Sequence, residues 1–125
     1  INSFGGSVFA GLSIIDTIID SDIPIVSIVE GSAASAATLI SVVCSERVIK
    51  PNSFMLIHQL SSGFWGKMEE IKDEFINLKK LTKKLKGIYK KHTNIEKEKL
   101  KSLLKRDLWL DSAECLELGL VDRVE

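Results

Sequence analysis

Short apolar runs and helical apolar spacing alternate along the first part of the chain. The short runs, which predict buried strands, lie at 25–29, 47–49 and 54–58. Segments 8–19 and 36–43 have the length and apolar pattern of helices, and Ser7 stands at the N-cap position of the first. This alternation predicts an α/β fold of mainly parallel strands joined by right-handed crossovers.

A long amphipathic helix is predicted over 67–91, after a loop or irregular strand at 61–66. Residues 67–106 hold fourteen of the seventeen lysines and arginines, although the whole chain has a net charge of zero. Because these cations fill the outward positions of helices, and no base-reading motif lies among them, we interpret them as a solvated face. We therefore predict no nucleic-acid partner, whereas an acidic protein partner stays an open alternative.

Two capping boxes are predicted in the last third of the chain. Thr93 and Glu96 predict the start of one helix, and Asp111 and Glu114 predict the start of a shorter one that ends at Gly119. With 125 residues, 45% hydrophobic and 27% charged, the composition is that of one globular domain covering the whole sequence.

The chain opens at Ile1, already within a predicted strand end, so we expect upstream strands to be missing from this sequence. Cys44 and Cys115 lack the spacing of a disulfide framework or a zinc site, and His58 and His92 are the only histidines. We predict no metal. Neither a signal peptide nor a run long enough to span a bilayer is visible, and a cytoplasmic protein without a membrane partner is the expectation.

Four candidate functional groups lie at the ends of the predicted elements. Gly5-Gly6 closes an early strand, Ser35 separates a strand from a helix, His58 ends a later strand, and Asp107 follows a helix. A serine attacks a carbonyl when an imidazole accepts its proton and a carboxylate orients that imidazole. Glycine lets main-chain N–H groups approach the resulting oxyanion.

Each group also has a simpler interpretation. Ser35 could be an N-cap, His58 a core histidine, and Asp107 a partner of Arg106. Taken singly, these interpretations are favoured, but their joint placement beside Gly5-Gly6 favours an acyl-transfer site. The α/β-hydrolase fold is disfavoured, because the order is serine, histidine, acid, and because alanines replace the two glycines of its nucleophile turn.

Four motifs resemble the ClpP family of serine peptidases, in register over nearly the whole chain. They lie at 1–7, 31–35, 51–59 and 112–122. The resemblance implies the ClpP/crotonase-like fold, with repeated β-β-α units and a protruding handle over about 61–92. It makes Ser35 the nucleophile, His58 the general base and Asp107 the orienting acid. The oxyanion donors would be the backbone N–H groups of Gly6 and Ala36.

The resemblance also implies a substrate and partners. The substrate would be unfolded polypeptide, paired by strand addition with the main chain near Gly5 and over Gly63, Phe64, Trp65 and Gly66. Heptameric rings would stack in pairs as a tetradecamer and receive substrate from a AAA+ unfoldase. No metal or organic cofactor is implied.

Some residues depart from the housekeeping pattern. Phe4 and Leu60 replace prolines, and Ala36-Ala37 replaces a Met-Gly pair. The run 33–37 and Trp109-Leu110 look more like the ClpP-related head-maturation proteases of tailed phages. A viral head-maturation protease is therefore one alternative. An acyl-CoA-binding crotonase-like enzyme and an inactive ring subunit are the others.

Overall fold

The computed structural model describes all residues from 1 to 125. The helices are α1 (Val8–Ile19), α2 (Ala36–Val42), α3 (Met68–His92), α4 (Lys97–Leu103) and α5 (Ser112–Glu117). The strands are β1 (Val26–Val29), β2 (Ser32–Ala34), β3 (Glu46–Ile49), β4 (Phe54–Leu56), β5 (Trp109–Leu110) and β6 (Arg123–Val124). Helices and strands alternate, which confirms the predicted α/β fold.

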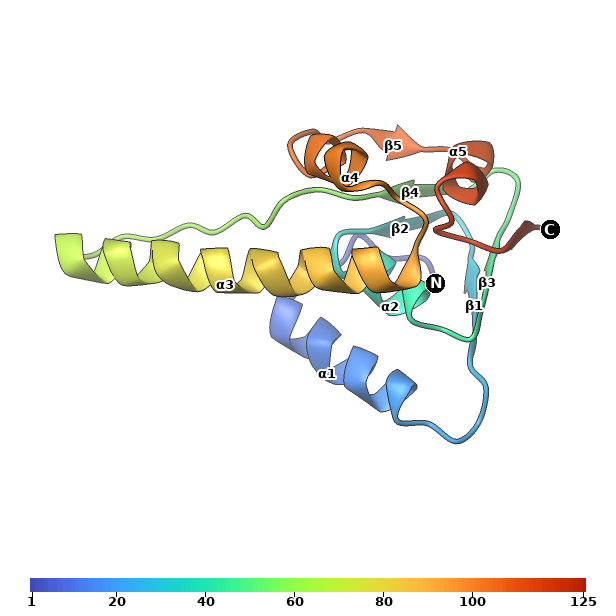
Figure 1. Cartoon of the computed structure of the whole chain (residues 1–125), viewed down its shortest axis with the longest axis horizontal. Helices are drawn as coiled ribbons and strands as arrows, with labels where there is room; N and C mark the ends of the chain where they lie inside the picture. Colours follow the sequence, from blue (N-terminus) through green and yellow to red (C-terminus); the bar gives the residue numbers. More distant parts are fainter.

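The strands form two small sheets. One has the order β1-β3-β6 and the other β2-β4-β5, and every neighbouring pair is parallel except β4 and β5. The chain crosses from the first sheet to the second at Gly31, whose φ is 85°, and again at the turn Pro51-Asn52. It thereby repeats a β-β-α unit, first as β1-β2-α2 and then as β3-β4-α3 (Figure 1).

The N-terminal residues lie along β2. Ser3 forms a parallel bridge with Ala33, its N–H donates to the carbonyl of Ser32 (2.9 Å), and its carbonyl accepts from the N–H of Ala34 (3.0 Å). The predicted strand end before Gly5 is thus one bridge long. This bridge carries the following glycines to the N-terminus of α2.

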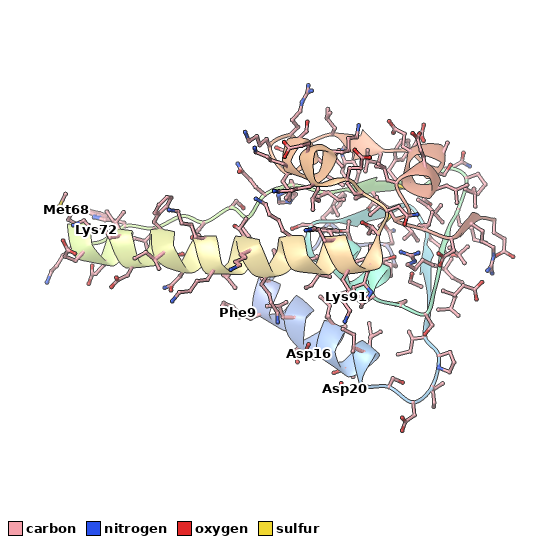
Figure 2. All side chains as sticks on the ribbon, in the orientation of Figure 1. Phe9, Asp16, Asp20, Met68, Lys72 and Lys91 are labelled. Atoms are coloured by element: carbon pink, nitrogen blue, oxygen red, sulfur yellow. The ribbon has the colours of Figure 1, made fainter.

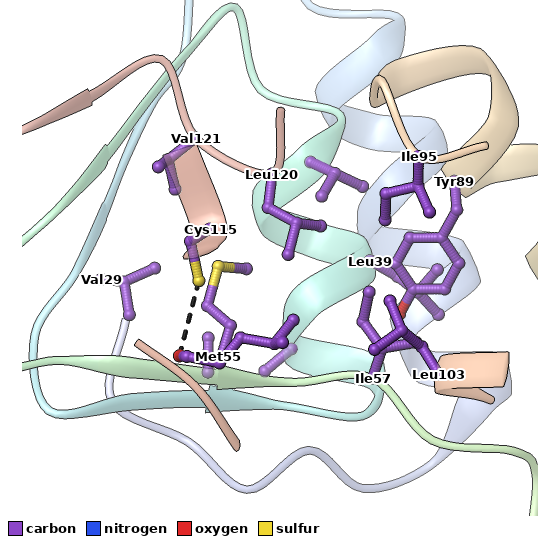
Figure 3. Packing of buried hydrophobic residues seen from close by; sticks show 14 of the residues in the cluster. Val29, Leu39, Met55, Ile57, Tyr89, Ile95, Leu103, Cys115, Leu120 and Val121 are labelled. Atoms are coloured by element: carbon purple, nitrogen blue, oxygen red, sulfur yellow. Dashed lines mark hydrogen bonds between the residues drawn. The ribbon is translucent and has the colours of Figure 1, made fainter. Parts of the chain in front are cut away.

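A core of 20 buried residues fills the space between the sheets and the helices. Figure 3 shows Leu39, Ile57, Tyr89 and Leu103 packed together on one side of it, with Cys115, Leu120 and Val121 on the other. The burial of these apolar side chains is the main favourable contribution to folding. The core also holds α2 and the C-terminal end of α3 in place, and these two helices flank the candidate site.

The long helix α3 projects far beyond the body of the molecule, and residues 57–67 run beside it (Figure 1). Only Leu85 and Tyr89 of α3 are buried. Met68, at the free end of the helix in Figure 2, is 73% exposed. None of the five helices has the length and apolar character that a membrane crossing requires.

One of the two capping boxes is confirmed and the other is wrong. The N–H of Glu114 donates to Asp111 Oδ1, and the N–H of Asp111 donates to Glu114 Oε2, both at 2.9 Å. Thr93 instead caps the C-terminus of α3, where its hydroxyl donates to the carbonyl of Tyr89 (2.7 Å). The next helix takes Glu96 itself as its N-cap, because the extended backbone at Thr93 separates the two helices.

Two predicted strands differ in extent from what the structure shows. The strand predicted at 54–58 ends at Leu56, and His58 lies just beyond it in irregular backbone. Residues 61–66 form no strand, in agreement with the loop that was one of the two predictions for them. Because His58 and residues 61–66 lie outside any strand, their main-chain groups have no strand partner on this side of the candidate site.

Candidate functional site

Ser35 lies between β2 and α2 in a backbone conformation that few residues adopt. Its φ is 56° and its ψ is −126°, and it is the only residue other than glycine with a positive φ. Such a conformation costs about 1–3 kcal/mol and persists only where its surroundings enforce it. One such contact is on β4, where the carbonyl of Leu56 accepts the N–H of Ser35 (2.9 Å).

The simpler interpretation of Ser35 as a capping side chain is wrong. Although Ser35 occupies the N-cap position of α2, its side chain makes no cap hydrogen bond. The first turn of the helix therefore does not engage the hydroxyl, which lines a hollow with His58. A half-buried serine with an unengaged hydroxyl, in an enforced conformation, is suited to nucleophilic chemistry.

Gly5 lies directly against Ser35. A Cβ atom added to Gly5 would lie 2.6 Å from the carbonyl oxygen of Ala34, 2.8 Å from Ser35 Cβ and 3.0 Å from the nitrogen of Ala36. Its φ of 91° is a second reason for glycine. The N–H groups of Gly6 and Ala36 donate to no group in the chain. Two amide donors beside a serine can hold an anionic oxygen.

His58 faces the same small hollow as Ser35. This hollow, of about 20 Å³, is lined by Val8, Ser35, Ala36, Leu39, His58, Gln59, Leu60, Thr82, Leu85, Lys86, Tyr89 and Leu104. Ser35 and His58 share it without a hydrogen bond between them. His58 Nδ1 lies 2.5 Å from the carbonyl oxygen of Gln59. Because a carbonyl only accepts, Nδ1 is the donor in this contact, and in the neutral imidazole Nε2 is then the acceptor that a general base needs.

Asp107 lies apart from this pair. It is exposed in the connection between α4 and β5, it does not line the hollow, and it forms no hydrogen bond or ion pair, not even with Arg106. Leu104, three residues earlier, does line the hollow. The structure therefore brings Ser35 and His58 together beside the glycine backbone and leaves the carboxylate outside.

Comparisons with known proteins identify the family of the chain. The whole chain, residues 1–125, matches the family described as Clp protease. The chain belongs to the Clp protease family. It is also 36% identical over 126 residues to the ATP-dependent Clp protease proteolytic subunit of Deinococcus radiodurans. That alignment covers 99% of this chain and 62% of the relative, so the chain spans less than two thirds of the relative's length.

The segment 63–66, which family resemblance associates with substrate, lies outside the hollow in this Clp protease family member. It follows the outer part of α3 (Figure 1), and Phe64 and Trp65 are 50% and 89% exposed. No residue from 60 to 66 takes part in a backbone hydrogen bond. The main chain here is therefore available for pairing, and a role in substrate binding stays a prediction.

The sequence did not indicate a buried polar chain beneath the nucleophile. Thr38 Oγ1 donates to the carbonyl of Ser35 (2.6 Å) and is in short contact with the hydroxyl of Tyr89. Both side chains are buried, and burial raises the pKa of Tyr89 far above its ordinary value, with a smaller opposing effect from the bond to Thr38. Neither residue type marks this pair in the sequence, because a tyrosine in an amphipathic helix and a single threonine in an apolar one are both ordinary.

The two cysteines are not competing nucleophiles. Burial is the largest influence on both thiols and raises the pKa of Cys44 above its ordinary value and that of Cys115 to about 12. Thiols with raised pKa values stay protonated near neutral pH and attack carbonyls poorly. No group of three or more His, Cys, Asp or Glu side chains is placed to hold a metal ion.

Proposed function

We propose that this chain is the proteolytic part of a serine endopeptidase that hydrolyses peptide bonds in unfolded polypeptides. One observation carries the proposal: Ser35 is in an enforced positive-φ conformation, with the backbone of Gly5 against it and His58 across the hollow. Membership of the Clp protease family supports the assignment, and the relative in Deinococcus radiodurans is named as a proteolytic subunit.

In the proposed reaction, Ser35 Oγ attacks the carbonyl carbon while His58 Nε2 accepts its proton. The N–H groups of Gly6 and Ala36 hold the negative oxygen of the tetrahedral intermediate. His58 then returns the proton to the leaving amine, which gives an acyl-enzyme. Water activated by His58 hydrolyses the ester and frees Ser35. No metal or organic cofactor takes part in these steps.

Asp107 completes the site in this proposal by replacing the carbonyl of Gln59 at His58 Nδ1. A carboxylate there would stabilise the imidazolium that forms when Ser35 is deprotonated, which a neutral carbonyl does less well. Asp107 itself is exposed and takes part in no hydrogen bond or ion pair, so it can move without breaking one. We propose that subunit assembly brings about this shift.

Substrate and partners follow from the exposed parts of the handle, residues 61–92. We propose that extended polypeptide pairs with the free main chain of Gly63 to Gly66, while Phe64 and Trp65 contact its side chains. Exposed apolar residues on the body and at the free end of the handle, including Phe4 at 77% and Met68 at 73%, suit burial between subunits. Seven-membered rings stacked in pairs, supplied by a AAA+ unfoldase, are the assembly we propose.

The direct test is peptide hydrolysis by a Ser35→Ala variant. Removal of the nucleophile should lower kcat by several orders of magnitude without changing the oligomeric state. Ser13→Ala, on the exposed face of α1, is the matched control and should keep wild-type kcat. Hydrolysis that persists in Ser35→Ala, in a preparation free of other proteases, would refute the assignment of Ser35.

A further inference from the structure

Two buried hydroxyls connect the handle to the nucleophile. Tyr89 lies on α3 and is 2% exposed, and Thr38 lies on α2 and is 0% exposed. Thr38 Oγ1 is bonded to the carbonyl of Ser35 at 2.6 Å and is in contact with the hydroxyl of Tyr89. A buried hydroxyl pair is stable only when its hydrogen bonds are all satisfied, so this geometry is strongly constrained.

The direction of the hydrogen bonds follows from the number of protons. Thr38 has a single hydroxyl proton, and a carbonyl can only accept, so that proton goes to Ser35. The proton between Thr38 and Tyr89 must then come from Tyr89. Burial raises the pKa of Tyr89, which keeps this hydroxyl a donor near neutral pH. Tyr89 therefore donates to Thr38, which donates to the carbonyl of Ser35.

That carbonyl belongs to the same peptide unit as the N–H of Ala36. Because the unit is planar and trans, the direction of its carbonyl sets the opposite direction of its N–H. The carbonyl accepts twice, from Thr38 Oγ1 and from the N–H of Thr38 at 3.0 Å. On the other side of Ser35, its own N–H is bonded to Leu56. Both peptide units that flank the positive φ are thus fixed.

We propose that Tyr89 and Thr38 are positioning residues that aim the N–H of Ala36 at the oxyanion. This inference rests on the proposed function, because it assigns these residues to the same site. It makes the base of the handle part of the catalytic machinery, although neither side chain touches the substrate. The effect is on the transition state, since the oxyanion forms only after attack.

The test distinguishes an effect on the direction of the Ala36 N–H from an effect on the stability of the fold. Tyr89→Phe should lower kcat roughly tenfold and Thr38→Val roughly a hundredfold, with KM changed less than about twofold, since loss of one oxyanion donor typically costs 10²–10³ in kcat. Thr38→Ser keeps the hydroxyl and should retain wild-type kcat. Thr38→Val leaves the buried hydroxyl of Tyr89 without its partner, and Tyr89→Phe removes the hydrogen bond that Thr38 accepts, so both single variants should melt at lower temperature.

The double variant Thr38→Val/Tyr89→Phe is decisive. It removes both hydroxyls and leaves no unpaired polar group, so its melting temperature should return toward that of the wild type. Its kcat should stay low, because the side-chain bond to the Ser35 carbonyl is lost and only the backbone N–H of residue 38 still donates to that carbonyl. Recovery of kcat together with melting temperature would overturn the inference and leave a purely structural role.

A crystal structure of the double variant keeps the inference testable even if the wild type hydrolyses no peptide. We expect the peptide between Ser35 and Ala36 to rotate, which would turn the Ala36 N–H away from Gly5. An unrotated peptide would overturn the positioning role, whatever the activity of the wild type. Absence of hydrolysis by the wild type alone would count against the proposed function, not against this inference.

Discussion

At the scale of single residues, Gly5 and Ser35 constrain each other. The backbone of Gly5 approaches so closely that a Cβ there would lie 2.8 Å from that of Ser35. Non-bonded carbon atoms prefer separations of about 3.5–4.0 Å, so no other residue type fits without displacing the nucleophile. The same approach brings Gly6 to the N-terminus of α2, where the helix dipole favours negative charge.

Substitution of Gly5 should therefore damage the site more than the fold. We expect Gly5→Ala to lower kcat for peptide hydrolysis by at least about a hundredfold, the effect of losing an oxyanion donor. An alanine at position 5 would keep the positive φ, which should also lower the free energy of unfolding by about 1–3 kcal/mol. Gly87→Ala is the matched control, because nothing lies within 4 Å of a Cβ added to Gly87. Equal kcat values for Gly5→Ala and the wild type would contradict the role of this backbone.

The sequence indicated those site residues that belong to local motifs, but it gave no sign of contacts between residues far apart in the chain. Ser35 and His58 could be predicted to share a site, because the ends of neighbouring parallel strands meet at one edge of a sheet. The bond between Thr38 and Tyr89 joins residues 51 positions apart, and neither residue type marks it. The position of Asp107 away from His58 reflects an exposed connection that the sequence pattern does not constrain.

At the scale of elements, Arg47 joins three parts of the chain. From β3, its guanidinium donates to the carbonyls of His92 (2.6 Å) at the end of α3 and Gly119 (2.8 Å) after α5. It also pairs with the carboxylate of Asp122 (2.5 Å). The hydrogen bond from Arg47 is the main reason that the pKa of Asp122 lies below its ordinary 3.8, and the charge of Arg47 contributes in the same direction.

The ion pair between Arg47 and Asp122 predicts that the stability of the fold depends on pH. A carboxyl whose pKa is lower in the folded state stabilises the fold above its ordinary pKa and loses that contribution as pH falls through the folded value. We expect Asp122→Asn to melt a few degrees below the wild type at pH 7 and to lose less stability on acidification below about pH 4. Melting curves from pH 7 to pH 2 measure both effects.

Asp73→Asn is the control for this pH series, because Asp73 is exposed and unpaired on α3. It should follow the wild-type curve. If Asp122→Asn and the wild type lost stability in parallel on acidification, the ion pair would contribute nothing measurable.

The longest elements could be predicted from the sequence, and the shortest could not. The helix predicted over 67–91 is observed as Met68–His92, because its apolar spacing persists for many turns. The strands β2, β5 and β6 have three, two and two residues. Segments this short carry no measurable alternation, and the small residues of β2 favour strands only weakly. Pairing with β4 makes Ser32–Ala34 a strand, and that pairing is a tertiary effect.

At the scale of the whole molecule, part of the exposed apolar surface lies along the projecting handle. Met68, Ile71 and Phe75 are 73%, 50% and 58% exposed along its outer half. Only the inner end of α3, at Leu85 and Tyr89, reaches the core. A helix with an unpartnered apolar stripe is stabilised when another surface covers it, as the proposed stacking of rings would do.

A charge placed in this stripe should disrupt assembly and leave the fold intact. We expect Phe75→Glu to shift the full-length protein from paired rings to single rings, as measured by sedimentation velocity. Lys90→Ala, at the exposed inner end of α3, should sediment like the wild type. Paired rings that persist in Phe75→Glu at micromolar concentration would contradict the role of the handle in stacking.

The measurement that tests the central claim most directly is the site of modification by a fluorophosphonate, which reacts with activated serine hydroxyls. The full-length wild-type protein should be labelled at Ser35 and at no other serine, as mapped by mass spectrometry of its peptides. His58→Ala should slow this labelling strongly, because the proton acceptor is lost. Labelling elsewhere, or an unmodified Ser35 after prolonged exposure of the assembled protein, would contradict the assignment of Ser35 as the nucleophile.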